Sequence, residues 1–288
     1  MSSKNPVLPA NGSSPVATAQ ACHSQKNGES ASIPSNGGQK TAQLLVSVRD
    51  LAEAALAQAA GVDWIDLKEP RSGALGRAEL QVAQAVAEQL VNHNQRSAAL
   101  GELHHLKNGV AADFAKLFPF LKVGLSQLQP SRLEKFNNAW RDQFLSLASD
   151  LHQLGSHLIP VIYADYQTCD APSPDDVLCV AQQAGAQFVL IDTFTKNGLS
   201  LTDWLGIHDL QAKILAARNF DCGVVLAGSL KTEHVHSLVT LAPKALGVRG
   251  AVCTGHRGGT VCPKKLSHWC ALMHCRPLAT DANRELQH

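Results

Sequence analysis

The sequence lacks the features of several protein classes. No uninterrupted apolar run reaches the length of about 18 residues that marks a candidate membrane-spanning helix. The net charge is only +1 with neutral histidines, so no basic excess indicates nucleic acid binding, and no acidic tail is present. Hydrophobic residues make up 45% and charged residues 17% of the 288 residues, which is enough for a sizeable core. We therefore expect a soluble protein without a membrane or nucleic acid partner.

A secretory origin is not expected either. Residues 1–20 lack the apolar stretch of a signal peptide. Eight cysteines are present, but Cys169, Cys179 and Cys222 fall inside or beside predicted elements of a long chain rather than in a compact disulfide framework. The sequence predicts a cytoplasmic protein with reduced thiols.

Metal-binding spacings are also missing. The thirteen histidines include no HExxH pattern, and the cysteines include no CxxC pattern. A loose cluster near the end contains Cys262, Cys270, Cys275, His268 and His274. Helix packing is the interpretation that this spacing favours, with a structural metal as the alternative. We expect no metal site.

Composition divides the chain into three parts. Residues 1–41 are rich in Ser, Asn, Gly, Ala and Gln, cannot offset the entropy of ordering, and are predicted to be a disordered low-complexity tail. Residues 276–288 resemble them and are predicted to be a flexible C-terminal tail. Residues 42–275 remain as the folded domain, close to the roughly 250 residues of an eight-stranded barrel.

Short apolar runs alternate with helical patterns through the folded part. Strands are predicted at 44–48, 62–67, 98–103, 120–123, 158–163, 188–192, 223–227 and 245–248, and helices between them include 110–118, one from Pro130, 201–218 and 232–241. Asp50 and Glu53 form a capping-box pattern at the first helix. Eight ordered strand–helix pairs imply parallel pairing and predict an α/β fold, a (β/α)₈ TIM barrel, with a doubly wound open sheet as the alternative.

Three lysines follow strands of this predicted barrel. Lys68, Lys122 and Lys196 come at or just after the second, fourth and sixth strands, where side chains point into the barrel mouth. Neighbouring ammonium groups and partial burial both disfavour the charged form. One amine becomes neutral and can attack a carbonyl, while a neighbouring lysine moves protons. A single such lysine would be interpreted as an ordinary surface residue. The hypothesis therefore rests on three lysines at corresponding strand ends.

Carboxylates and glycines complete the strand ends. Asp192 is predicted to orient or accept protons, and Asp66, Glu102 and Asp165 are candidate supporting carboxylates. Loops after the last two strands often hold phosphate through backbone N–H groups. We expect the following residues to contribute there: Gly228, Ser229, Gly247, Arg249 and Gly250. The extension at 255–259 is interpreted as a mobile lid or a plain flexible loop.

Taken together, these stretches resemble the (5-formylfuran-3-yl)methyl phosphate synthase family, in collinear order over about residues 43–273. The matching stretches begin at Leu44, Ile65, Gly73, Leu121, Tyr163, Asp192, Lys196, Leu226 and Gly247. Departures are Glu69, where the family usually has Asn, and Asn197, where it usually has Asp. The glycine-rich loop after Arg249 also differs, and residues 1–40 have no counterpart.

The resemblance implies a TIM-barrel carbon–oxygen lyase that joins two glyceraldehyde 3-phosphate molecules without metal or organic cofactor. By that analogy Lys68 forms the Schiff base, Lys122 transfers protons, and Asp192 and Lys196 match further active-site positions. The product would serve a methanofuran-type cofactor of one-carbon metabolism. The expected partner is a small phosphorylated aldehyde, and a homo-oligomer is compatible with the sequence. The alternatives are a class I aldolase acting on another sugar phosphate and a non-catalytic phosphate-binding barrel.

Overall fold

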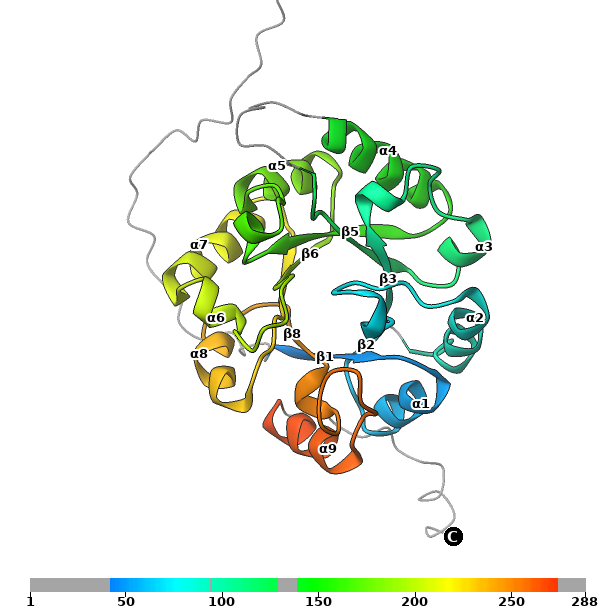
Figure 1. Ribbon diagram of the computed structural model, residues 1–288, viewed down its shortest axis with the longest axis vertical. Coiled ribbons are helices and arrows are strands. Elements are labelled where there is room, and N and C mark those ends of the chain that lie inside the picture. The colour runs from blue at the N-terminus through cyan, green and yellow to red at the C-terminus, as the bar shows by residue number, and fades with distance from the viewer. Residues whose placement is uncertain (1–41, 94, 129–138, 274–288) are drawn as a thin grey trace, which may run out of the picture. The chain divides into compact units, whose positions relative to one another are not determined.

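A closed ring of eight parallel strands forms the centre of the computed structural model, which describes residues 42–93, 95–128 and 139–273. The strands pair in chain order from β1 to β8, and β8 returns to pair with β1, with Leu45 opposite Gly247. Helices surround this ring on the outside (Figure 1). The predicted (β/α)₈ TIM barrel is confirmed, and the open-sheet alternative is excluded. The predicted tails at 1–41 and 276–288 lie outside the described residues.

The strands and helices alternate along the chain. The strands are β1 Gln43–Val48, β2 Trp64–Leu67, β3 Arg96–Glu102, β4 Phe120–Gly124, β5 His157–Tyr163, β6 Phe188–Asp192, β7 Gly223–Leu226 and β8 Ala245–Val248. The helices are α1 Leu51–Ala59, α2 Leu80–Gln89, α3 Ala112–Ala115, α4 Ala139–Gln153, α5 Pro174–Gln183, α6 Leu201–Trp204, α7 Ile207–Arg218, α8 Val235–Val239 and α9 Pro263–Leu272. Among the described segments, no helix is long and apolar enough to cross a bilayer.

Several helices differ from the predicted ranges. The single helix predicted over 201–218 is two helices, because Leu205 has extended backbone and Gly206, a poor helix former, precedes α7. The helices predicted over 110–118 and 232–241 are shorter, as α3 and α8. The predicted start of the long helix at Pro130 lies outside the described residues, and its described part is α4.

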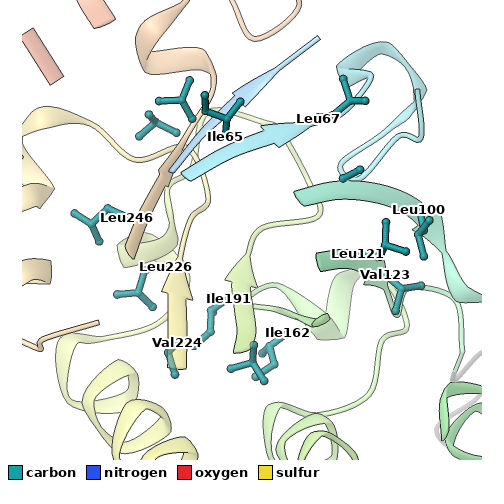
Figure 2. Close-up of a cluster of buried hydrophobic side chains, with 14 of the residues drawn as sticks. Ile65, Leu67, Leu100, Leu121, Val123, Ile162, Ile191, Val224, Leu226 and Leu246 are labelled. Carbon is teal, nitrogen blue, oxygen red and sulfur yellow. The ribbon is translucent and has the colours of Figure 1, made fainter. Parts of the chain in front are cut away.

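The larger hydrophobic core lies between the strands and the helices. Figure 2 shows side chains on the outer faces of the strands, among them Ile65 of β2, Leu121 of β4, Ile191 of β6 and Leu226 of β7. All four are completely buried. Because both faces of such a sheet are covered, the strands have nearly continuous apolar sequences rather than a strict alternation. Because helices cover the outer face of the strands, the polar side chains of the sheet lie on its inner face.

A second, smaller core fills the interior of the barrel. Trp64, Phe120 and Phe188 come from alternate strands and pack with ring centroids 5.0–5.6 Å apart. Two residues further along each strand the inward positions are Asp66, Lys122 and Leu190, since side chains alternate across a strand. The aromatic layer therefore closes the barrel beneath a polar layer. This floor shields Asp66 and Lys122 from water on one side.

Leu226→Ala should destabilise the protein by about 2–5 kcal/mol, because the fully buried side chain leaves a cavity between β7 and the helices. Leu215→Ala is the matched control, since Leu215 on α7 is 50% exposed and its loss should stay within about 0.5 kcal/mol. Urea unfolding followed by circular dichroism gives both values. Equal losses in the two variants would contradict this account of the core.

Candidate active site

A cavity of about 510 Å³ opens at the carboxyl ends of the strands. Lys68, Lys122, Asp192 and Lys196 all line it. They come from β4, β6 and the loops that follow β2 and β6. The closed ring thus brings together Lys68 and Lys196, which are 128 positions apart in the sequence. The structure thus places the three predicted lysines in one cavity instead of on separate surfaces.

Asp66 and Lys122 form a buried ion pair at the bottom of the cavity. Their exposed fractions are 0% and 3%, and Lys122 Nζ lies 2.5 Å from Asp66 Oδ2. The hydroxyls of Ser47 and Ser97 donate to the two Asp66 oxygens at 2.9 and 2.7 Å. Trp64 Nε1 in turn donates to the Ser97 hydroxyl at 3.1 Å. The carboxylate is thereby held in one orientation by side chains from three other strands, β1, β3 and β4.

Asp192 and Lys196 form a second ion pair. Lys196 Nζ donates to Asp192 Oδ1 at 3.0 Å and to the carbonyl of Thr193 at 2.5 Å. Burial alone would raise the pKa of Asp192, but the positive charges of Lys196 and Lys68 and the hydrogen bonds to its carboxylate outweigh burial and lower the pKa. Asp192 is therefore an ionised carboxylate that can orient a cation or accept a proton.

Lys68 lies in the field of both pairs but belongs to neither. Its side chain is buried, with 7% of the residue exposed, and no described residue forms a hydrogen bond or ion pair with its Nζ. Burial lowers the pKa of Lys68 from 10.5 to about 7; Asp192 and Asp66 oppose that shift, while Lys122 and Lys196 add to it. Of the two causes expected from the sequence, burial is the larger and the neighbouring lysines are the smaller. A substantial fraction of this amine is neutral and nucleophilic near pH 7.

The two other predicted carboxylates act outside the cavity lining. Asp165 accepts from the backbone N–H groups of Phe194 and Thr195 at 2.7 Å each, and so shapes the loop that carries Lys196. Glu102 accepts from Tyr163 Oη at 2.6 Å and from Ser126. These residues support neighbouring loops and do not face the space where a substrate would lie.

A close backbone approach explains the glycine that follows Lys122 and Val123. A Cβ on Gly124 would lie 2.3–2.4 Å from the Glu102 carboxylate and the Tyr163 hydroxyl, which is closer than atoms tolerate. Glycine is therefore required where β4 ends beside the Glu102–Tyr163 contact.

The glycine-rich turns after β7 and β8 lie on one wall of the cavity. Gly228, Ser229, Gly247 and Gly250 line it, as predicted for the candidate phosphate-binding loops. Gly228 has φ +106°, a conformation that side chains rarely adopt, and Ser229 has φ +50°. This turn brings the backbone close to the cavity without a bulky side chain.

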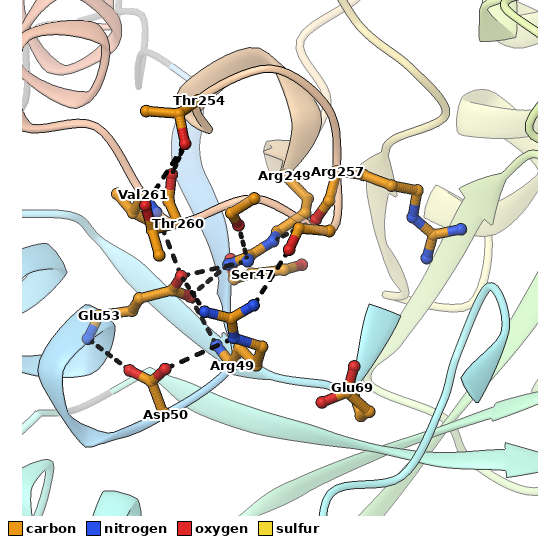
Figure 3. A network of polar contacts seen from close by, with 12 residues as sticks. Ser47, Arg49, Asp50, Glu53, Glu69, Arg249, Thr254, Arg257, Thr260 and Val261 are labelled. Carbon is orange, nitrogen blue, oxygen red and sulfur yellow. Dashed lines mark hydrogen bonds and ion pairs between the residues drawn. The ribbon is translucent and has the colours of Figure 1, made fainter. Parts of the chain in front are cut away.

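Arg249 has a different role from the predicted phosphate ligand. All five of its N–H donors bond within the protein: to Glu53 through both terminal nitrogens, and to the carbonyls of Ser47, Arg257 and Gly259. Figure 3 shows this network. Arg249 is 6% exposed and Glu53 5%, so the pair is buried. With no donor left over, Arg249 positions the loop after β8 and would bind an anion only by breaking these bonds.

Glu53 was predicted to complete a capping box at the start of α1, and only half of that box forms. Asp50 caps the helix by accepting from Glu53 N at 3.0 Å. The Glu53 carboxylate instead accepts from the backbone N–H of Arg49 and of Val261, because the buried guanidinium of Arg249 draws it toward the last loop. Tertiary contact thus replaces a local helix cap.

Sequence reasoning missed Ser47, Ser97, Lys231 and Arg257. Ser47 and Ser97 hold Asp66, and Lys231 and Arg257 line the cavity. A period-2 count along the first and third strands would have placed both serines inside the barrel. Lys231 and Arg257 belong to loops, where no sequence period indicates which side chains face the cavity.

None of the cysteines in the described part of the chain lines this cavity. Burial raises the pKa of Cys169 and of Cys222 to about 12. Within the described ranges, no group of three or more His, Cys, Asp or Glu side chains could hold a metal ion. Of the terminal Cys/His cluster, His274 and Cys275 lie outside those ranges.

The residues that form this barrel and cavity also match known proteins in sequence. The sequence profile of the 4-HFC-P synthase family matches residues 44–270. The chain belongs to this family. It is 30% identical over 228 residues to the (5-formylfuran-3-yl)methyl phosphate synthase of Archaeoglobus fulgidus, which covers 76% of this chain and 94% of that protein. The enzyme of the same name from Methanocaldococcus jannaschii is 30% identical, over 74% and 90% of the two chains.

Solved structures that resemble this family member share only its fold. Phosphoribosyl anthranilate isomerase from Thermus thermophilus superposes with a TM-score of 0.52 at 15% identity, covering 81% of this chain and 98% of that one. Thiamine phosphate pyrophosphorylase from Pyrococcus furiosus gives 0.52 at 11% identity, over 82% and 96%. At these sequence identities the structural similarity supports the barrel fold and gives no information about the reaction.

The Lys68 amine should react with a small acylating reagent in a pH-dependent way with a midpoint near pH 7. Protonation blocks the nucleophile below its pKa, so reactivity should rise through pH 6–8 and then level off. Mass spectrometry of the Lys68 peptide gives the profile, with the exposed Lys107 as the reference on the same sample. Reactivity of Lys68 that still climbs tenfold per pH unit above pH 9 would contradict the lowered pKa.

Asp66→Asn should destabilise the protein by about 3–5 kcal/mol, because it leaves the Lys122 ammonium buried without its counter-ion. The double variant Asp66→Asn/Lys122→Met should recover most of this loss, since it removes the uncompensated charge. A double-mutant cycle from urea unfolding measures the coupling. Additive losses in the two single variants would show that the pair does not interact as the structure indicates.

Proposed function

We propose that the protein joins two molecules of glyceraldehyde 3-phosphate through a Schiff base on Lys68 and forms (5-formylfuran-3-yl)methyl phosphate. The relatives from archaea carry the name of the synthase for this product. The observation that carries the proposal is the buried amine of Lys68, which shares one cavity with Lys122, Asp192 and Lys196 and whose pKa burial lowers to about 7. We place this activity in the cytoplasm, where it supplies a methanofuran-type cofactor.

The overall reaction balances without an oxidant or reductant. Two triose phosphates contain the atoms of one furan aldehyde phosphate, one inorganic phosphate and two water molecules. Carbon–oxygen bonds break to release phosphate and water, which makes the enzyme a carbon–oxygen lyase. All steps are proton transfers, additions and eliminations, so the reaction needs no metal or organic cofactor.

Lys68 is proposed to act as the nucleophile. Its neutral amine adds to the aldehyde carbon of one triose phosphate and loses water to give an imine. The imine withdraws electrons, so the proton on the adjacent carbon can be removed and the resulting enamine carbon can bond to the second triose. Hydrolysis at the end returns the free amine. The low-water interior favours the neutral amine that starts this sequence.

The two ion pairs are proposed to handle protons on either side of Lys68. Lys122 lines the cavity and is held in place by its ion pair with Asp66, so it is positioned to exchange a proton with a bound substrate. Asp192 can accept a proton from substrate, and Lys196 beside it balances the charge that results. The backbone N–H groups near Gly228 and Gly250 would hold a substrate phosphate on the neighbouring wall.

The test is incubation of the protein with glyceraldehyde 3-phosphate alone. We expect a furan chromophore, inorganic phosphate, and, after borohydride reduction, a triose adduct on the Lys68 peptide. A reversible aldol product without phosphate release would indicate a class I aldolase instead. Neither product nor adduct would indicate a phosphate-binding barrel without catalysis.

Lys68→Arg should abolish both the reduced adduct and product formation, because a guanidinium cannot form the imine. Lys122→Arg should keep the adduct on Lys68 but reduce turnover by about 10²–10⁴, the range lost with a general acid–base group. Mass spectrometry and a continuous assay at the furan absorption band measure the two effects. Unchanged turnover in Lys122→Arg would remove Lys122 from the proton transfers, and an adduct in Lys68→Arg would refute the assignment of the nucleophile.

A further inference from the structure

Arg257 lines the cavity and reaches toward the loop after β2, three strands around the ring from the glycine turn after β7. It lies in the loop that follows β8, and its terminal nitrogen Nη2 donates to the carbonyl of Gly73 at 2.8 Å. Gly73 belongs to the loop after β2, five residues beyond Lys68. The guanidinium therefore bridges the last loop to the loop beside the proposed nucleophile.

The backbone around Arg257 is held by two other arginines. The carbonyls of three consecutive residues accept hydrogen bonds: Arg257 from Arg249 Nε at 3.0 Å, Gly258 from Arg49 Nη1 at 3.0 Å, and Gly259 from Arg249 Nη2 at 2.7 Å. Glu53 anchors the arrangement by pairing with Arg249 and approaching Arg49 Nη2 to 3.7 Å (Figure 3). This clamp fixes the loop in place without using the Arg257 side chain.

The Arg257 guanidinium keeps most of its donors for another partner. Of its five N–H groups, the contact with Gly73 is the one hydrogen bond that the described residues provide. Arg249, eight positions earlier, has none left. Arg257 also lies close enough to feel the charge of Asp192, which opposes the lowering of its pKa by burial. A partly desolvated fork with unused donors is the arrangement that recognises a phosphate group.

We propose that Arg257 binds a second phosphate group on the β2 side of this cavity, separate from the phosphate expected at the Gly228 turn after β7. This inference rests on the proposed function in one respect: condensation of two triose phosphates requires two phosphate groups to be held at once. The clamp built by Glu53, Arg249 and Arg49 presents the guanidinium, so Arg249 acts as a positioning residue for Arg257. One arginine orders the loop and the other meets the ligand.

Chemical modification of the wild-type protein tests the binding without requiring turnover. Phenylglyoxal should modify Arg257, and inorganic phosphate at about ten times its dissociation constant should slow that modification about tenfold, because bound phosphate covers the guanidinium. Arg71, exposed and outside the cavity lining, is the matched control and should show no protection. Peptide mass spectrometry follows both sites. Equal rates at Arg257 with and without phosphate would overturn the proposal.

Kinetics of variants test whether the same contact serves substrate. Arg257→Gln should raise the half-saturating concentration of glyceraldehyde 3-phosphate about tenfold, and Arg257→Lys should recover part of it, because lysine keeps the charge without the fork. Arg71→Gln should match the wild type. Since the clamp does not use the Arg257 side chain, the unfolding temperature of the variants should fall only by the roughly 2–4 °C expected from losing the hydrogen bond to Gly73.

The outcomes separate this inference from the proposed function. A wild-type protein that forms no adduct and no furan refutes the proposed function, while phosphate protection of Arg257 would still support an anion site. A wild-type protein that forms furan, with Arg257→Gln equal to it at every substrate concentration, refutes the role of Arg257 alone.

Discussion

The lowered pKa of the Lys68 amine depends on its burial away from water beside two ion pairs. Burial lowers its pKa to about 7, and the carboxylates of Asp192 and Asp66 limit the shift. Without Lys122 and Lys196 as their partners, those carboxylates would hold the Lys68 ammonium in its charged form. The neutral nucleophile thus follows from a balance between desolvation and a charge arrangement in which each acid already has a cation of its own.

The barrel architecture supplies both parts of this balance. Aromatic side chains from alternate strands close the interior beneath Asp66, and the outward core under the helices keeps the strands in register. Inward positions two residues further along the strands then open into the cavity. The same closure places loops from opposite ends of the sequence against each other, as in the contact of Arg257 with Gly73 and of Arg249 with Glu53.

Two arginines of the last loop illustrate why charge alone does not identify a ligand-binding residue. Arg249 occupies the predicted position at a strand end, yet its donors are all used in holding the loop. Arg257 lies in a segment that the pattern described only as a lid or a flexible loop, and its donors remain available toward the cavity. The distinction follows from which backbone carbonyls lie within reach, and those carbonyls come from residues far away in the sequence.

The amino-acid sequence by itself determined the eight strands, their order and the side chains at their ends, because short apolar runs and the residues that follow them are local features of the sequence. The strands at 188–192 and 245–248 were predicted with their exact bounds. The bounds of α6 and α7 were not, because Gly206 interrupts a segment whose apolar residues follow one continuous helical period. Only the tertiary structure decided which charges pair. Lys122 meets Asp66, Glu53 meets Arg249, and Lys68 keeps no partner among the described residues, because Coulomb interactions and desolvation depend on distances across the ring that no local pattern records.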